Sequence, residues 1–247
     1  MGRMTGVALA LAVAVAVGLM GCGDDDDGGT TVDSGVVADA SGPDAAVGCV
    51  KRWRVQKIGT AAVSSATVES GALVLRSSMS AQTDLLNLLP MMTLTGDFSA
   101  TIRFENFVAG GMGAFVQSAV ADPTLGANAP FATAAIGNVP LEGLSAAFKN
   151  PAGVTDVDAT TIKSGEFQFV RTGGMLTVTA VALGGTPAST ASQAFTIMPL
   201  QLGLQIGTNS QTFDPETSIR ITEIAITGGG AGGPAQTDDF SCDSIMR

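Results

Sequence analysis

The side chains that this chain lacks limit the chemistry open to it. The 247-residue sequence contains no histidine and no tyrosine. Catalytic triads that use histidine, zinc or iron sites built on imidazole, and tyrosine acting as an acid or base are therefore excluded. Carboxylates, hydroxyls and three cysteines remain as candidate functional groups.

The glutamates do not form a catalytic pattern. They are scattered along the chain at Glu69, Glu105, Glu142, Glu166, Glu216 and Glu223. Glycoside hydrolysis needs two carboxylates at a defined separation, and no Glu-x-Asp-x-Glu segment places two of them on one face of a strand. We therefore expect that the protein is not an enzyme, although separate strands can still bring two carboxylates together.

Calcium is the metal that the remaining oxygen ligands suit. Asp156 and Asp158 lie in an expected loop, and Asp238 and Asp239 closely precede Cys242. These two pairs are candidates for a structural calcium site, but the EF-hand spacing is missing. Solvated aspartates in turns explain the same residues without a metal. The sequence indicates no other cofactor.

An apolar run near the N-terminus ends at Cys22. Arg3 is the only charge before an Ala/Val/Leu-rich run over residues 7–19, which has the length of a secretory signal and is short for a membrane-spanning helix. Leu19-Met20-Gly21-Cys22 resembles the lipobox of bacterial lipoproteins. The resemblance implies that residues 1–21 are a signal peptide and that Cys22 is acylated, with palmitate for example, as the first mature residue. A cleaved signal with a free Cys22 is the alternative.

The segment that follows Cys22 is acidic and of low complexity. Residues 23–48 contain seven aspartates and no basic residue. Such a composition cannot bury enough apolar surface to offset the entropy of ordering, so we expect residues 22–48 to be a disordered tether. The remaining residues 49–247 carry 15 acidic and 11 basic side chains. This mild negative charge argues against nucleic acid as a partner.

Cys49 and Cys242 lie near the two ends of the 49–247 domain. An exported chain reaches an oxidising compartment, where two such cysteines predict a disulfide. The bond would close a loop of nearly the whole domain, worth about 4–5 kcal/mol in the chain-entropy treatment. Two unpaired thiols are the alternative. Trp53, the only tryptophan, is expected to pack beside this bond rather than to stack on a sugar.

Alternating apolar and polar residues dominate the domain. Residues 98–105 and 200–206 both have the period of a strand with one wet face. Residues 166–171 and 175–183 flank Gly173-Gly174, which predicts a hairpin. Further strands are expected over residues 62–68, 72–76, 113–120, 131–136, 144–148 and 192–197.

Two local features depart from plain alternation. Ile219 and Ile221 have the opposite parity to Ile224 and Ile226, so we expect a β-bulge near residues 222–223. Residues 84–89, preceded by Thr83 and stopped by Pro90, predict one helical turn. The glycines at 228–233 are expected to form a flexible connector.

The order of these strands resembles a known fold. Residues 71–75, 96–104, 167–171 before Gly173-Gly174, and 219–226 resemble the strands of the concanavalin-type, laminin-G-like jelly roll. The resemblance spans most of residues 52–227 and implies an all-β, antiparallel β-sandwich. It also implies that the first and last strands pair, and that a calcium ion can sit at the rim. The leader, acidic spacer and terminal cysteines resemble those of surface lipoproteins of Gram-negative soil bacteria.

Three functions follow from these features. The first is a non-catalytic lipoprotein of the cell envelope, held by lipid in the outer membrane, whose sandwich binds a glycan or an envelope protein. The second is a passive structural or coat protein without a ligand. The third, least favoured by the scattered glutamates, is a glycan-active enzyme. An exposed apolar row on a sheet would favour the first, a Ser/Thr/Gln face the second, and two carboxylates about 5–10 Å apart in a cleft the third.

Overall fold

The structure is a computed structural model of the chain. It describes residues 50–58, 64–77, 85–90, 93–110, 114–122, 130–138, 142–148, 162–184, 187–196, 198–208, 216–229 and 236–246. The described residues form strands, turns and connections, and these ranges contain no helix of the length and apolar character that a membrane span requires. Cys22, Cys49, the expected tether, Asp156 and Asp158 lie outside the described residues.

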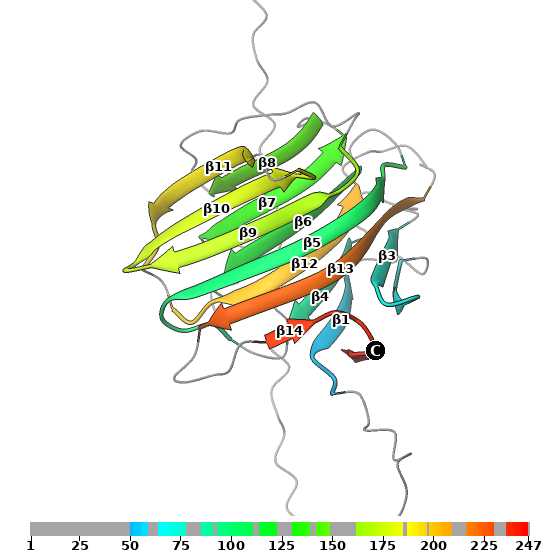
Figure 1. Cartoon of the computed structure of the whole chain (residues 1–247), viewed down its shortest axis with the longest axis horizontal. Helices are drawn as coiled ribbons and strands as arrows, with labels where there is room; N and C mark the ends of the chain where they lie inside the picture. Colours follow the sequence, from blue (N-terminus) through cyan, green and yellow to red (C-terminus); the bar gives the residue numbers. More distant parts are fainter. Residues whose placement is uncertain are drawn as a thin grey trace, which may run out of the picture.

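Two sheets pack face to face (Figure 1). The seven-stranded sheet contains, in spatial order, β15 (Ile245–Met246), β1 (Trp53–Ile58), β4 (Leu85–Pro90), β12 (Gln201–Thr208), β6 (Ala114–Ala121), β7 (Phe131–Asn138) and β8 (Glu142–Phe148). The eight-stranded sheet contains β11 (Pro187–Ala194), β10 (Met175–Ala182), β9 (Gly165–Thr172), β5 (Phe98–Val108), β13 (Thr217–Gly228), β3 (Leu73–Ser77) and β2 (Ser65–Val68), with β14 (Gln236–Asp238) paired to β13. The predicted antiparallel β-sandwich is confirmed.

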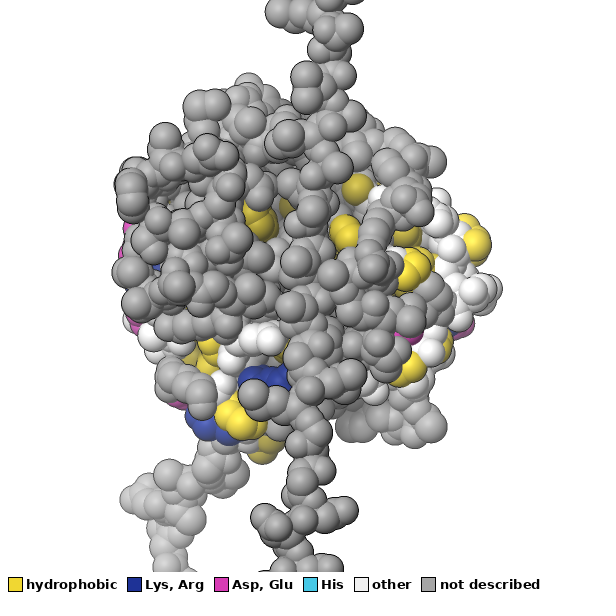
Figure 2. All heavy atoms as spheres, turned by 180° about the vertical axis from the view of Figure 1, so that it is seen from behind, with side chains coloured by type: hydrophobic (Ala, Val, Ile, Leu, Met, Phe, Trp, Pro, Cys, Tyr) yellow, Lys and Arg dark blue, Asp and Glu magenta, His cyan; other side chains and the backbone are white. Residues whose placement is uncertain are grey.

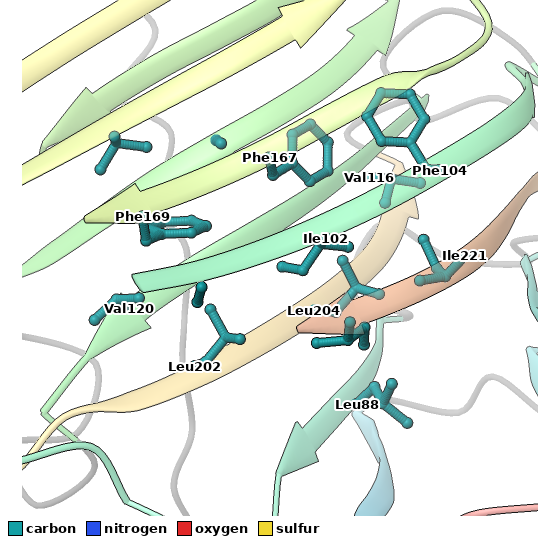
Figure 3. Close-up of a cluster of buried hydrophobic side chains, with 14 of the residues drawn as sticks. Leu88, Ile102, Phe104, Val116, Val120, Phe167, Phe169, Leu202, Leu204 and Ile221 are labelled. Carbon is teal, nitrogen blue, oxygen red and sulfur yellow. The ribbon is translucent and has the colours of Figure 1, made fainter. Parts of the chain in front are cut away.

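The core lies between the two sheets. Ile102, Phe104, Phe167 and Phe169 of the eight-stranded sheet face Val116, Val120, Leu202 and Leu204 of the seven-stranded sheet (Figure 3). The rings of Phe104 and Phe167 lie 4.8 Å apart. Each large apolar side chain buried in this way contributes about 1.5–3 kcal/mol. The inner faces of the described strands thereby form the core, and their outer faces are the parts of the two sheets left for other contacts.

The helical turn expected over residues 84–89 is wrong. Leu85–Pro90 form β4, which pairs with β1 on one side and β12 on the other. Leu86 and Leu88 are fully buried while Asn87, between them, points to the outer face. The four leucines of this segment fit a helix through residues 85, 88 and 89 as well as a strand through residues 86 and 88. Backbone hydrogen bonds to two neighbouring strands decide for the strand.

The hairpin and the bulge are confirmed. Gly173 and Gly174 join β9 to β10 with positive φ angles of 58° and 84°. The register between β13 and β5 shifts between Ile221 and Glu223, which lets all four isoleucines reach the core. A second shift in the same pair was not predicted. It falls where Asn106 adopts a φ of 55° and moves Phe107 into the core.

Two glycines after β13 are fixed rather than flexible, contrary to the expected connector. Gly228 and Gly229 have φ angles of 75° and 79°. A Cβ on Gly228 would lie 2.5 Å from the Asp97 carbonyl oxygen, and one on Gly229 would lie 2.8 Å from Leu94 Cδ2. The Gly229 amide also donates to the Asp97 carbonyl at 2.9 Å. At Gly228 the Asp97 backbone leaves no room for a Cβ, and at both positions the positive φ favours glycine. Residues 230–233 lie outside the described ranges.

The two ends of the domain meet at one edge of the sandwich. Trp53 is in register with Ile245 in a parallel β1–β15 pair, and the Arg52 and Trp53 amides donate to the Ser244 carbonyl. We call residues 236–246 the C-terminal strap, because β14 joins the eight-stranded sheet while β15 joins the seven-stranded sheet. The expectation that the segment around Trp53 lies beside the C-terminal segment is confirmed.

A buried hydrogen bond fastens the strap to β1. Trp53 is 4% exposed, and its indole Nε1–H donates to Asp238 Oδ2 at 2.8 Å. The other carboxylate oxygen, Asp238 Oδ1, accepts from the Phe240 amide at 3.0 Å. Phe240 has a φ of 54° and is fully buried. One aspartate thus holds the indole and the turn that leads the strap from one sheet to the other.

We predict that Asp238→Ala destabilises the protein by about 1–3 kcal/mol, because it leaves the buried indole N–H without its acceptor. Unfolding in urea, followed by the fluorescence of the single tryptophan, measures the effect. Asp239→Ala is the matched control, since Asp239 is exposed and its hydrogen bonds from Ser241 are local. Equal unfolding midpoints for the two variants would contradict the role assigned to Asp238.

Candidate functional site

The calcium candidates that the structure describes have protein partners. Both oxygens of Asp238 accept hydrogen bonds, from Trp53 and Phe240. Hydrogen bonds from Ser241 lower the pKa of the exposed Asp239 carboxyl. Within the described ranges, no three acidic, cysteine or histidine side chains gather where they could hold a metal. Asp156 and Asp158, the other predicted pair, lie outside those ranges.

The described glutamates form ion pairs with arginines on the eight-stranded sheet. Arg103 contacts Glu166 at 2.8 Å and Glu223 at 3.0 Å. Glu105 lies 3.0 Å from Arg220. Each carboxylate therefore has a guanidinium partner on an outer face, rather than a second carboxylate across a cleft. The side chain of Glu142 is not among those described.

Two of these glutamates have a lowered pKa. Hydrogen bonds from Arg76 and Thr67 bring the pKa of Glu69 down to about 2. For Glu166, partial burial raises the pKa, but hydrogen bonds from Gln168 and Arg103 outweigh it and the net pKa is lowered. A general acid needs a pKa raised toward the working pH. These two carboxylates are ionised at neutral pH and suit ion pairing rather than proton donation.

The rest of the outer face of the eight-stranded sheet carries hydroxyl side chains. The Thr177 and Ser192 hydroxyls are hydrogen bonded at 2.9 Å, and both lie on exposed strand positions. Exposed large apolar side chains are few and scattered among the described residues, at Val50, Val108, Val170, Met175 and Leu183. Among the described residues, this face therefore shows no apolar patch.

The outer face of the seven-stranded sheet carries a row of amides. Asn87 of β4 is in register with Gln205 of β12, and Gln205 with Gln117 of β6. We call these three residues the amide row. The same register line continues to Gln56 of β1 on one side, and through Ala135 to Ser145 of β8 on the other. Six adjacent strands thus contribute one position each to a line that crosses the sheet.

The amides are buried and bonded to one another although they belong to an outer face. Gln117 Nε2–H donates to Gln205 Oε1 at 2.6 Å, and Gln205 Nε2–H donates to Asn87 Oδ1 at 2.7 Å. The exposed fractions of Asn87, Gln117 and Gln205 are 5%, 3% and 6%. A buried amide is tolerated only when it is hydrogen bonded. The two bonds fix the amide orientations and use part of the donor and acceptor capacity of the three groups.

Small side chains lie next to the amide row. The neighbouring register line contains Gly203, Ala119, Thr133 and Ala147. A Cβ at Gly203 would lie 3.4 Å from Leu89 Cδ2 and 4.0 Å from the Ala119 carbonyl oxygen. These four positions carry small side chains, and the large side chain that lies against Gly203 is Leu89 of β4.

Two phenylalanines lie on the same outer face. Phe115 precedes Gln117 by two residues on β6, and Phe131 begins β7. Both are half-buried and neither belongs to the hydrophobic core between the sheets. The sequence suggests core parity for most phenylalanines, but these two alternate with the inward residues of their strands. Phe115 and Phe131 directly precede the inward-facing Val116 and Ala132. Because strand side chains alternate between faces, this spacing could have indicated that both rings lie on the outer face.

This face thus combines amide groups with phenyl rings. Gln205 uses both its N–H and its carbonyl within the row, so only part of the hydrogen-bonding capacity of the amides remains. A phenyl ring adds an apolar surface that a sugar ring can cover. Trp53 is not part of this face, because its indole is buried against Asp238.

Figures 1 and 2 show the same molecule from opposite sides. The eight-stranded sheet is in front in Figure 1, so Figure 2 shows the side of the seven-stranded sheet. On that side, the described side chains in view are mostly hydrophobic or uncharged (Figure 2). Lys and Arg gather toward the lower end, and Asp and Glu appear mainly toward the rim. The described part of this face is therefore poor in charge.

Comparisons with known proteins bear on the fold. No protein-family profile matches the sequence, and no curated protein matches it. Among solved structures, a legume lectin-like domain from Entamoeba histolytica has a TM-score of 0.51 at 10% identity, over 72% of this chain and 91% of that domain. A prokaryotic β-1,3-1,4-glucanase (lichenase) derived from a mouse hindgut metagenome has a TM-score of 0.51 at 12% identity, over 73% of this chain and 94% of that enzyme.

A third similar structure is the alginate lyase AlgAT5 of polysaccharide lyase family 7. It has a TM-score of 0.50 at 11% identity, over 72% of this chain and 94% of the lyase. Identities this low carry information about fold and none about activity, since one sandwich fold hosts many functions. The chain folds as a concanavalin-type jelly roll, the architecture of lectins and glucanases alike.

Proposed function

We propose that the protein is a non-catalytic lipoprotein of the cell envelope whose sandwich binds a glycan on the outer face of the seven-stranded sheet, over the amide row. The observation that carries this proposal is the line of buried, mutually oriented amides on the outer face of the seven-stranded sheet. Small residues on one side and Phe115 on the other give this line the mixed polar and apolar surroundings that sugars use. The lectin-like, glucanase and lyase neighbours add support, since their names all refer to carbohydrate.

Binding without catalysis agrees with the placement of the carboxylates. The amide row and its register neighbours contain no described carboxylate, whereas hydrolysis needs a pair. Four described glutamates form ion pairs with arginines on the eight-stranded sheet: Glu69, Glu105, Glu166 and Glu223. The proposed site therefore holds its ligand and leaves it unchanged.

A passive coat role is the second candidate, and one observation favours it. The outer face of the eight-stranded sheet is hydroxyl-rich and ion paired, with only scattered exposed apolar residues among those described. A face of this kind keeps a protein soluble without selecting a partner. In our proposal this face binds no partner, and the outer face of the seven-stranded sheet binds the ligand.

The place of the protein is proposed from its N-terminal sequence. Acylation of Cys22 would hold the chain in the outer membrane, and residues 23–48 would act as a spacer. A flexible coil of that length has an r.m.s. reach of about 30 Å. The domain could then meet an envelope or extracellular glycan without leaving the membrane surface.

The amide row is tested with a glycan array. Gln117→Leu is expected to weaken the best-bound glycan about tenfold, because one charge-free hydrogen-bonding group is worth about 1 kcal/mol or more. Gln168→Leu is the matched control: Gln168 also donates one side-chain bond, to Glu166, but on the other sheet. Parallel arrays in calcium and in EDTA test the structural calcium that Asp156 and Asp158 could bind.

A second variant distinguishes a loss of binding from a loss of folding. Phe115→Ala removes a half-buried ring that lies outside the core, so the fold should survive while binding falls. Thermal melting establishes that each variant is folded. Wild-type affinity in both folded variants would contradict the proposed site.

Lipid anchoring is tested at Cys22. Cys22→Ser is expected to move the protein from the membrane fraction to the soluble fraction, because the thiol that accepts the lipid is gone. Fractionation with immunodetection measures this. Cys242→Ser serves as the control, since it removes a cysteine without touching the leader. Continued sedimentation of Cys22→Ser with membranes would reject the anchor.

We further propose that Cys49 and Cys242 form a disulfide. The side-by-side placement of β1 and β15 supports it, as does the bond from Lys51 Nζ to the Asp243 carbonyl at 2.8 Å. Following this parallel register toward the N-terminus leads from Trp53 and Ile245 to residues 50 and 242. Cys242 has an interaction partner in the structure.

The bond is expected in protein purified from the envelope. Mass spectrometry of a non-reduced digest should find the 49–242 linked peptide, and reduction should lower the melting temperature because the loop constraint is lost. Two free thiols in that protein would show the pairing to be wrong.

A further inference from the structure

The edge strands of the two described sheets, β15, β8, β2 and β11, differ in how they are protected against pairing with another chain. β15 is two residues long and belongs to the C-terminal strap. β2 has four residues, and the ion pair of Arg76 and Glu69 lies beside it. At β8, the Ala146 amide donates to Ser189 Oγ of β11 at 2.9 Å. Three of the edges are thus short, charged or in contact with another strand.

The fourth edge strand, β11, is long and uncharged. It has eight residues, none of them acidic or basic, and a proline only at its first position. It lies at the end of the eight-stranded sheet (Figure 1), and among the described strands only β10 pairs with it. Thr190, Ser192 and Ala194 are exposed to solvent. β11 is therefore the edge best suited to accept a further strand.

The hydrogen-bonding pattern shows which backbone groups of β11 point away from β10. The Phe195 amide donates to the Gly174 carbonyl at 2.7 Å, so these opposed residues form a hydrogen-bonded pair. Hydrogen-bonded and non-hydrogen-bonded pairs alternate along antiparallel strands. The register with β10 is unbroken from this pair through Ala194, Ser192 and Thr190. The N–H and C=O groups of these three residues therefore face the open side of the sheet.

We infer that β11 pairs with β11 of a second copy of this chain, antiparallel and about a two-fold axis at Ser192. In this register Ser192 lies opposite its own counterpart, and Thr190 lies opposite the counterpart of Ala194. The outward N–H groups of each copy then meet outward carbonyls of the other. The contact uses an edge of the eight-stranded sheet and neither outer face, so it does not depend on the proposed glycan site.

A second copy is the occupant that the side chains of β11 favour. In a two-fold strand pair, any charged residue near the axis would lie close to its own like charge. β11 consists only of Pro, Ala, Ser, Thr and Gln, so no like charges meet. A foreign strand selected by charge would need an oppositely charged side chain on β11, which the strand does not have. Cross-strand hydroxyl pairs, such as the one that joins Thr177 to Ser192, are favourable in the extended sheet.

The dimer is expected to be weak and reversible. One strand pair makes a small interface, and interfaces under about 1,200 Å² are typical of transient complexes. The formal charge of −10 makes two copies repel each other at low salt. Because β11 contributes no ion pair that salt could screen, added salt should strengthen the association.

The test uses the full chain with Cys22→Ser, which removes the proposed lipid so that membranes and detergent cannot bring copies together. Sedimentation equilibrium is run from about 1 μM to about 1 mM protein, the range of weak dissociation constants, at about 10 mM and about 1 M NaCl. Ser192→Pro removes the outward N–H at the centre of the pair and leaves the bonds to β10 in place. Ser192→Ala is the matched control, since it removes the same hydroxyl but keeps the N–H.

The parent chain is expected to change from one copy to two as its concentration rises, more readily at high salt. Ser192→Pro should weaken the dimer about tenfold or more, because one donor is lost from each copy. Ser192→Ala should dimerise as the parent does, and thermal melting establishes that both variants are folded. A monomer at every concentration, dissociation by salt, growth beyond two copies, or an unchanged dimer in folded Ser192→Pro would each overturn the inference.

Hydrogen exchange of the parent chain tests the same contact without a variant, and so holds even if Ser192→Pro does not fold. The amides of Thr190, Ser192 and Ala194 should exchange more slowly at high than at low protein concentration, because pairing gives them acceptors. The amides of Ala191 and Gln193, which face β10, should not change. A dimer in which the three outward amides exchange as fast as in the monomer would have its contact elsewhere, and the inference would be wrong.

Discussion

The burial of two inner faces against each other is the constraint on which the rest of this structure depends. Strand side chains alternate between faces, and the inner positions of both sheets hold the large apolar residues, from Phe167 and Phe169 on one sheet to Leu202 and Leu204 on the other. The two bulges between β5 and β13 preserve this arrangement. The shifts at Ile221–Glu223 and near Asn106 each restore inward parity to the residues that follow.

Once the inner faces are committed, the two outer faces are free to differ, and they do. The eight-stranded sheet carries hydroxyls and ion pairs that keep it hydrated. The seven-stranded sheet carries glycine, alanine and a line of amides that are hydrogen bonded to each other. A single core thus supports one outer face with hydroxyls and ion pairs and another with amides and small side chains.

The sequence alone predicted the features that depend on residues within a single strand or turn. The all-β class, the hairpin at Gly173-Gly174 and the bulge before Glu223 follow from alternation and turn chemistry that a short segment contains. The helical turn at 84–89 failed because two buried leucines in six residues fit either period, and pairing with β1 and β12 chose the strand. The bulge at Asn106 was missed because the polar residues around it hid the change of parity.

The candidate site was harder to predict for a physical reason. Asn87, Gln117 and Gln205 lie far apart in the chain and meet only through the register of β4, β6 and β12. No single segment contains that register. Asp238 was proposed as a calcium ligand because acidic residues in turns resemble such ligands, but its oxygens hold the indole of Trp53 and the Phe240 amide. The segment around Asp238 does not show that its partner is Trp53, which lies far away in the chain.

The way β1 enters the domain has a mechanical consequence. A load applied through residues N-terminal to Val50 reaches the sandwich at β1, which is paired with β4 over six residues and with β15 on its other side. A pull along β1 would shear these hydrogen bonds together instead of opening them one after another. The Trp53–Asp238 bond would then share the force with the strap, and so transmit it to both sheets. The edge where the two ends of the described domain meet is therefore paired in a geometry that resists tension along β1.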